Sequence, residues 1–267
     1  MRKNLYDILQ AQSFDLKEEY TRLYDLFFNA SPEFAGALDD SISNIIKENF
    51  LSCDRKLIKR CISLEDFDYT YKFNWLPTPQ NFSLEYFLTF CEYVHNFIVQ
   101  IYPLCNSTEQ DRLDQLDDNL LDCIDILGYG EFVKEEISIF VERKPETLAV
   151  AEIVEPALAY KVMEYNHHKM KGDLESKLSS LKMMADDIES ERKKLQEINN
   201  TLASQLFQLL NKFVRHTQSA TPYINTMEPD EIEACYDDIY QLWLLAKLEL
   251  DNLGRKERME ELLEKIR

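Results

Sequence analysis

The clearest pattern of apolar and polar residues in this sequence is a heptad repeat between Asp173 and His216. Leucine or isoleucine recurs at every seventh position, and a second set of mostly apolar residues follows each of these by four positions. The first set is Leu174, Leu181, Ile188, Leu195, Leu202 and Leu209, and the second is Leu178, Ala185, Arg192, Asn199, Leu206 and Phe213. This alternation of four and three residues predicts one long helix that buries a narrow stripe against another helix.

The flanks of this stripe indicate two kinds of packing. They are mostly polar before Leu195, as in a contact between two helices, and more apolar after it, as inside a bundle. We therefore expect residues 195–213 to form an antiparallel hairpin with a second heptad pattern at Ile232–Leu253. Residues 174–188 have no evident partner of equal length in the chain. They are expected to meet the same helix of a second copy, as a homodimer, or the short helix after Gly254.

The predicted interaction seam combines these positions with two polar residues. Arg192 and Asn199 are expected either to fix the register of the contact or to reach solvent at the edge of a bundle. The seam is Leu174, Leu178, Leu181, Ile188, Arg192, Leu195 and Asn199.

The rest of the chain predicts mainly helices. Serine or proline at the start of a stretch with helical spacing marks each helix. These starts are Ser13, Ser31, Ser83, Ser107, Pro145 and Pro156. Phe67–Phe73 alternates like a short strand. Glu131–Lys144 predicts either a β-hairpin that turns at residues 134–136 or one strand that pairs with residues 149–154, and we prefer the hairpin because Pro145 is typical of the start of a helix. Past Gly254, the apolar residues from Met259 to Ile266 predict a separate short amphipathic helix.

The predicted fold is mainly α. It is a multi-helix bundle with a small β-hairpin and a long heptad-patterned, coiled-coil-like helix followed by an antiparallel C-terminal helix. We expect three regions: an N-terminal helical region over residues 1–128, the hairpin with its connecting helices over residues 129–172, and the long helix with the C-terminal helical hairpin over residues 173–267.

Charge and composition narrow the classes of partner. The 267 residues include 30 Lys and Arg against 49 Asp and Glu, a net charge of −19, and such a surface repels phosphate backbones. No stretch approaches the ~20 apolar residues of a membrane span, and the first residues do not resemble a signal peptide. We therefore expect a cytoplasmic protein that binds neither nucleic acid nor membrane. The 6 cysteines form no C-x-x-C pair and are expected to be free thiols.

Motifs for known chemistry are mostly missing. The 5 glycines match neither a P-loop nor a dinucleotide-binding fingerprint, and no G-x-S-x-G or H-E-x-x-H pattern occurs. One constellation remains, because Glu92 and His95, like Glu164 and His167, form an E-x-x-H motif on a predicted helix.

Two such motifs supply much of the ligand set of a ferritin-like di-metal site holding iron, manganese or zinc. The remaining ligands would come from Glu18 or Glu19 and from Asp117 or Asp118. The simpler alternative is a partly buried His95 on an apolar helix face and an exposed pair of His167 and His168.

Three functional hypotheses follow from these patterns. The preferred one is a non-enzymatic protein that interacts or assembles through its long helix, with no cofactor. The alternative is a carboxylate- and histidine-rich metal enzyme built on the two E-x-x-H helices. A third is an acidic inhibitor or decoy that binds a basic surface. The acidic residues between Asp111 and Asp125 could serve a basic partner or a cation, but a solvated helix face is the default explanation.

Overall fold

A computed structural model describes residues 14–29, 41–71, 75–215 and 226–266 of the chain. These residues form 12 α-helices and one two-stranded antiparallel hairpin. The chain divides into two compact units, Met1–Phe140 and Val141–Arg267, called unit 1 and unit 2 below. Within the described ranges, no helix has the length and apolar character needed to cross a membrane.

Unit 1 is built on helices whose starts are capped by side chains. Asp15 caps α2, Ser41 caps α3, Ser83 caps α6, and Asn106 caps α7 in a capping box with Glu109. The start predicted at Ser31 lies outside the described residues. The helices of unit 1 are α2 (Leu16–Phe28), α3 (Ile42–Asn49), α4 (Arg55–Ile58), α5 (Leu64–Tyr71), α6 (Leu84–Ile101) and α7 (Ser107–Ile126), with 3₁₀ turns at Phe50–Ser52 and Tyr102–Leu104.

Helix α6 is the centre of the unit 1 core. Its buried residues lie on nearly every side of the helix, which is typical of a helix enclosed by others. Helices α2, α3 and α7 pack against it. Phe90 of α6 lies against Tyr20 and Phe27 of α2, with ring centroids 5.1 and 6.1 Å away.

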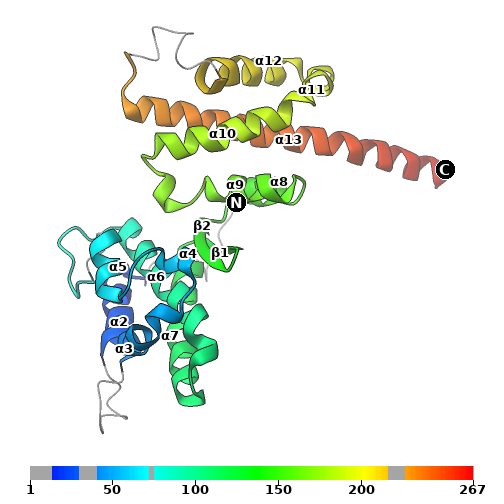
Figure 1. Ribbon diagram of the computed structural model, residues 1–267. Helices are drawn as coiled ribbons and strands as arrows, with labels where there is room; N and C mark the ends of the chain where they lie inside the picture. Colours follow the sequence, from blue (N-terminus) through cyan, green and yellow to red (C-terminus); the bar gives the residue numbers. More distant parts are fainter. Residues whose placement is uncertain (1–13, 30–40, 72–74, 216–225, 267) are drawn as a thin grey trace. The chain divides into compact units, whose positions relative to one another are not determined.

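The strand predicted at Phe67–Phe73 is wrong for residues 67–71, which belong to helix α5 (Leu64–Tyr71; Figure 1), and its last two residues lie outside the described ranges. Leu64, Phe67 and Tyr71 have helical spacing, and Phe67 packs on Phe97 of α6 at 5.3 Å between ring centroids. The Ser63 hydroxyl accepts the N–H of Asp66 in the first turn. The alternation of aromatic residues resembled a strand, but packing against α6 decides the conformation.

The predicted hairpin is confirmed. Strands β1 (Tyr129–Lys134) and β2 (Ile137–Glu142) pair through a turn at Glu135 and Glu136. Both turn residues have positive φ, 51° and 68°, as a two-residue turn of the primed type requires. Lys56 forms a 2.7 Å ion pair with Glu135 that ties this turn to α4. The boundary between the two units falls within β2.

Unit 2 is a helical bundle arranged along one long helix, α13 (Figure 1). Helices α8, α10, α11 and α12 all contact α13. The elements of unit 2 are α8 (Pro145–Ala151), α9 (Pro156–Glu164), a 3₁₀ turn (His168–Met170), α10 (Leu174–Glu189), α11 (Arg192–Ile198), α12 (Asn200–Leu209), a π-helical segment (Leu210–Arg215) and α13 (Pro229–Lys265).

The single long helix predicted over residues 173–216 is wrong. It is divided into α10, α11, α12 and the π-helical segment, with the major break at Asn199. That residue has a non-helical φ of −147°, and its side chain caps α12 by accepting the N–H of Leu202. It also donates to Glu249 of α13 at 3.0 Å. Asn199 therefore starts a new helix instead of occupying a coiled-coil seam.

The first half of the predicted seam has a partner within the chain, contrary to expectation. Leu181, Ile188 and Leu195 are fully buried, and α10 packs along α13. Leu174 and Leu178 pack on the edge of the same core. The expected packing of residues 195–213 on the C-terminal helix is found, since α11 and α12 both contact α13.

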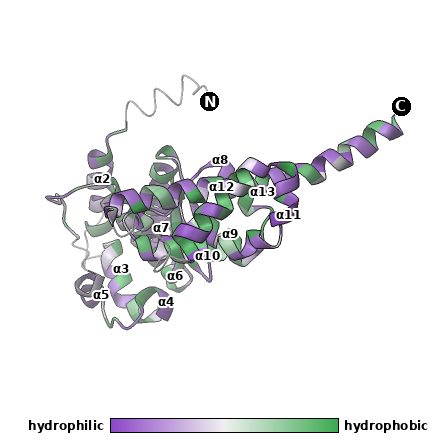
Figure 2. Ribbon diagram, turned by 90° about the horizontal axis from the view of Figure 1, so that it is seen from above, coloured by the Kyte–Doolittle hydropathy of each residue, from purple (hydrophilic) through white to green (hydrophobic). Residues whose placement is uncertain are grey.

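The separate short helix predicted after Gly254 is also wrong, because α13 continues through Gly254 to Lys265 and bends at residue 257. A side chain at Gly254 would approach only the end of Arg258 at 3.6 Å, so nothing around this glycine ends the helix. The last turns of α13 extend past the other helices of unit 2 in both views (Figures 1 and 2), and their residues are exposed.

Candidate functional site

His95 is the centre of a buried polar cluster in unit 1. Its Nδ1 lies 2.7 Å from a carboxylate oxygen of Asp117 on α7, and its Nε2 lies 3.0 Å from a carboxylate oxygen of Glu131 on β1. The hydroxyl of Ser138 on β2 donates to the same Glu131 oxygen at 2.6 Å. The cluster therefore joins α6, α7 and both strands of the hairpin.

The electrostatics of this cluster favour a protonated imidazole. Burial lowers the pKa of His95, but the hydrogen bonds and charges of Asp117 and Glu131 outweigh burial and raise it above its usual 6.5. For Glu131 the directions are reversed. Burial raises the pKa of its carboxyl, but the hydrogen bonds from Ser138 and His95 and the charge of His95 outweigh burial and bring the pKa below its usual 4.5. An imidazolium that donates both N–H groups to carboxylates satisfies all partners.

Other residues of the first E-x-x-H helix hold the hairpin. Asn96 donates to the carbonyl of Ser138 and accepts its N–H, both at 2.8 Å. The Glu92 carboxylate accepts the N–H of Phe140 at 3.3 Å. These bonds satisfy backbone groups of Ser138 and Phe140 on β2, so within unit 1 this helix has a structural role.

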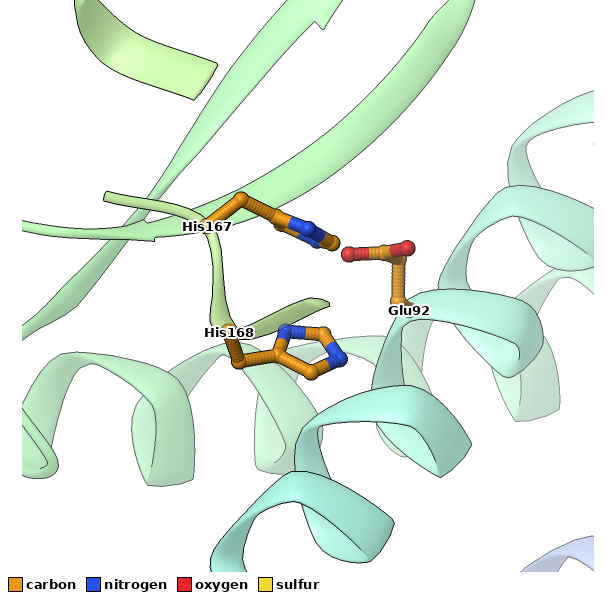
Figure 3. Close-up of side chains that lie close together, drawn as sticks. All are labelled: Glu92, His167 and His168. Carbon is orange, nitrogen blue, oxygen red and sulfur yellow. The ribbon is translucent and has the colours of Figure 1, made fainter. Parts of the chain in front are cut away.

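The second E-x-x-H motif lies in unit 2. Glu164 forms a 2.5 Å ion pair with Lys161, and Nδ1 of His167 accepts the N–H of Lys169 at 3.4 Å. His167 and His168, expected to be exposed, are buried, and their ring centroids lie 4.2 Å apart (Figure 3). Glu92, also labelled in Figure 3, belongs to α6 of unit 1.

The four predicted metal ligands are divided between the two units. Glu92 and His95 belong to unit 1, and Glu164 and His167 belong to unit 2. Asp117, named from the sequence as a further ligand, does lie next to His95. A metal ion at His95 would have to displace one of the two carboxylates from a ring nitrogen. The metal site therefore stays a prediction.

The inner face of α13 is held by two buried lysines. Lys177 of α10 reaches Asp237 at 2.6 Å and Glu233 at 2.7 Å. Lys247 reaches Glu191 at 2.8 Å and Asp187 at 3.1 Å. Each lysine is paired with two carboxylates, which offsets the cost of burying its charge. These pairs fix α13 within the bundle and so determine which face remains exposed.

The exposed face of α13 carries an apolar groove. Leu242, Leu245 and Leu248 line it together with Leu209 of α12, and its volume is about 550 Å³. Its polar residues are Glu146 of α8 and Asp238 and Gln241 of α13. The described residues that line the groove all belong to unit 2, and most of them are apolar with a few polar groups, as in a binding surface.

Beyond this groove, the projecting end of α13 exposes further apolar side chains. Figure 2 shows hydrophobic and hydrophilic residues alternating along this end. Their exposed fractions are 55% for Met259, 50% for Leu262, 48% for Leu263 and 72% for Ile266. The sequence predicted this amphipathic segment, but it was not predicted to lie on the same helix face as the groove. The signal for this was the alternating spacing of three and four residues that relates Leu245 and Leu248 to Met259 and Leu262.

Comparison with known proteins gives no relative: no protein-family model, no curated protein and no solved structure matches this chain.

Proposed function

We propose that this protein is an interaction or assembly protein that binds a protein partner through the exposed face of α13 in unit 2. The observation that carries the proposal is the apolar surface formed by the groove around Leu245 and the projecting segment from Met259 to Ile266. Exposed apolar side chains that gather on one face of a helix in this way are typical of protein interaction sites.

The electrostatic character of the chain is consistent with this function. A net charge of −19 opposes nonspecific association through the apolar face, because like-charged molecules repel one another. The buried clusters at His95, Lys177 and Lys247 already pair their charged groups within the fold, as structural networks do. They therefore give less support to a catalytic role than the apolar face gives to binding.

The proposal is tested by photo-crosslinking in cells that express the full chain. A benzophenone amino acid is placed at Leu262 on the apolar face or at Glu264, which lies on the opposite side of the same helix turn. We expect crosslinked protein of higher mass from the Leu262 position and much less from the Glu264 position. No adduct at Leu262, or equal adducts at both positions, would contradict the proposal.

A further inference from the structure

A single stripe of exposed or half-buried side chains joins the groove to the projecting end of α13. Its members recur at alternating spacings of three and four residues, the seam of a coiled coil. They are Asp238, Gln241, Leu245, Leu248, Asn252, Arg255, Met259, Leu262 and Ile266. Half of this seam crosses the groove, and the other half extends past the body of unit 2.

We propose that the seam binds the same seam of a second copy, with the two α13 helices antiparallel. The projecting end of each copy then fills the groove of the other. This inference rests on the proposed function and names its partner. An isologous contact with two-fold symmetry uses one surface twice, so a seam with a groove at one end and an apolar segment at the other is self-complementary.

The apolar residues fall opposite one another in this arrangement. Leu245 faces Leu262 of the second copy, and Leu248 faces its Met259. Beside these layers, Leu242 faces Leu263 of the second copy. The two-fold axis repeats the same contacts at the other end, so all the large apolar residues of the exposed face are covered in a single register.

Polar residues at the centre fix that register. Asn252 faces Arg255 of the second copy, and its amide oxygen accepts a hydrogen bond from the guanidinium. Moving one helix by a heptad would place Arg255 against Leu245, or Asn252 against Leu262. A polar layer that is satisfied in only one alignment specifies register at some cost in stability.

Charges beside the seam favour the antiparallel orientation. Glu249 falls opposite Lys256 of the second copy, and Asp251 falls opposite its Arg258. Within the chain, Glu249 already accepts from Asn199 and Asp251 accepts from Arg255, and each carboxylate has room for a second donor.

A parallel pair would place Arg255 against Arg255 at the centre of the seam, and of the flanking charges it would pair only Asp251 with Lys256. At the acidic end of the groove, which carries Asp238 and Glu146, the antiparallel pair brings in Lys265 of the second copy.

The test is sedimentation of the purified full chain between ~1 and ~100 µM, a range that covers weak and moderate dimers. The unmodified chain is expected to dimerise with increasing concentration. Leu262→Asp should raise the dissociation constant about a hundredfold, one tenfold factor for each of the two symmetry-related sites. The matched control, Ile62→Asp, changes an exposed isoleucine of unit 1 and should leave association unchanged. Circular dichroism checks that each variant is folded.

Charge reversal tests orientation and register. Glu249→Lys or Lys256→Glu alone places like charges opposite each other twice per dimer, so each variant should dimerise more weakly. A mixture of the two variants restores both opposite-charge pairs and should form a heterodimer as stable as the original dimer. In a parallel pair, Glu249 would instead face Leu244 and Asp251 would face Lys256. Glu249→Lys alone would then leave the opposite-charge pairs intact, and the mixture would restore only one of the two pairs that Lys256→Glu breaks.

A monomeric unmodified chain at the highest concentration, or a mixture that fails to associate, overturns the inference. If the chain is monomeric but Leu262 crosslinks another protein in cells, the proposed function stands and the second copy is the wrong partner.

Discussion

Leu181 of α10 distinguishes a seam buried within the chain from one that joins two chains. Its side chain is fully buried (0% exposed) in the core of unit 2, where α10 packs against α13. Replacement by alanine removes apolar contacts and leaves a cavity that the helices fill only in part. Leu181→Ala should therefore destabilise unit 2 without changing association, which depends on the opposite face of α13.

The magnitude follows from complete burial. Leucine-to-alanine changes at such sites cost about 2–5 kcal/mol, and we take about 3 kcal/mol for Leu181. With an m-value of about 2 kcal/mol/M in urea, the unfolding midpoint should fall by about 1.5 M. Met183 of the same helix is 40% exposed, so Met183→Ala is the matched control and should cost less than about 1 kcal/mol.

Tryptophan fluorescence measures the effect separately in each unit. The chain has 2 tryptophans, Trp75 in unit 1 and Trp243 in the core of unit 2. In a Trp75→Phe background, emission during urea unfolding reports only Trp243. A loss below about 1 kcal/mol for Leu181→Ala, equal to that of Met183→Ala, would refute burial of this seam within the chain. A dimer that dissociates on this change would refute it as well.

Three further predictions concern the polar clusters. Because the pKa of His95 is raised in the fold, the stability that its charged form gives unit 1 is fully present below pH 6.5 and is lost as pH rises through the folded-state pKa. His95→Gln should flatten this decline, measured by urea unfolding followed by Trp75 fluorescence. Tyr240→Phe should cost about 1–3 kcal/mol in thermal or urea unfolding, because its hydroxyl bonds Val162, Thr147 and Asn166 inside unit 2, and an unchanged midpoint would contradict this. If Glu92, His95, Glu164 and His167 form the predicted metal site, protein purified without chelator should carry near-stoichiometric iron, manganese or zinc, and His95→Ala should remove it. Protein that stays metal-free after reconstitution would end that hypothesis.

Local signals predicted the elements that depend on local chemistry. Ser83 caps α6, Pro145 and Pro156 start helices, and the hairpin turns where expected. Each of these features follows from a residue's own backbone preference or from a side chain that bonds a neighbouring N–H. Such preferences act within a few residues, so the sequence alone specifies them.

Features that depend on tertiary packing were missed. A heptad pattern identifies which residues face a partner, but not whether the helix that carries them is continuous, so the break at Asn199 was not predicted. The partners of His95 come from α7 and the hairpin, and only Asp117 was named beforehand. Gly254 was expected to permit a bend before a separate short helix, yet the helix continues through it, because a glycine costs an exposed helix only about 1 kcal/mol.

Hydrogen exchange along α13 tests the central claim, that its exposed face is the interaction surface, most directly. Turns 255–265 extend from the bundle, and a projecting helix end of this length opens readily by itself. We expect their amides to gain protection as protein concentration rises from ~1 to ~100 µM, while the amides of α10 exchange equally slowly at both concentrations. Equal exchange of residues 255–265 at both concentrations, with partner crosslinking also missing at Leu262, would contradict the claim.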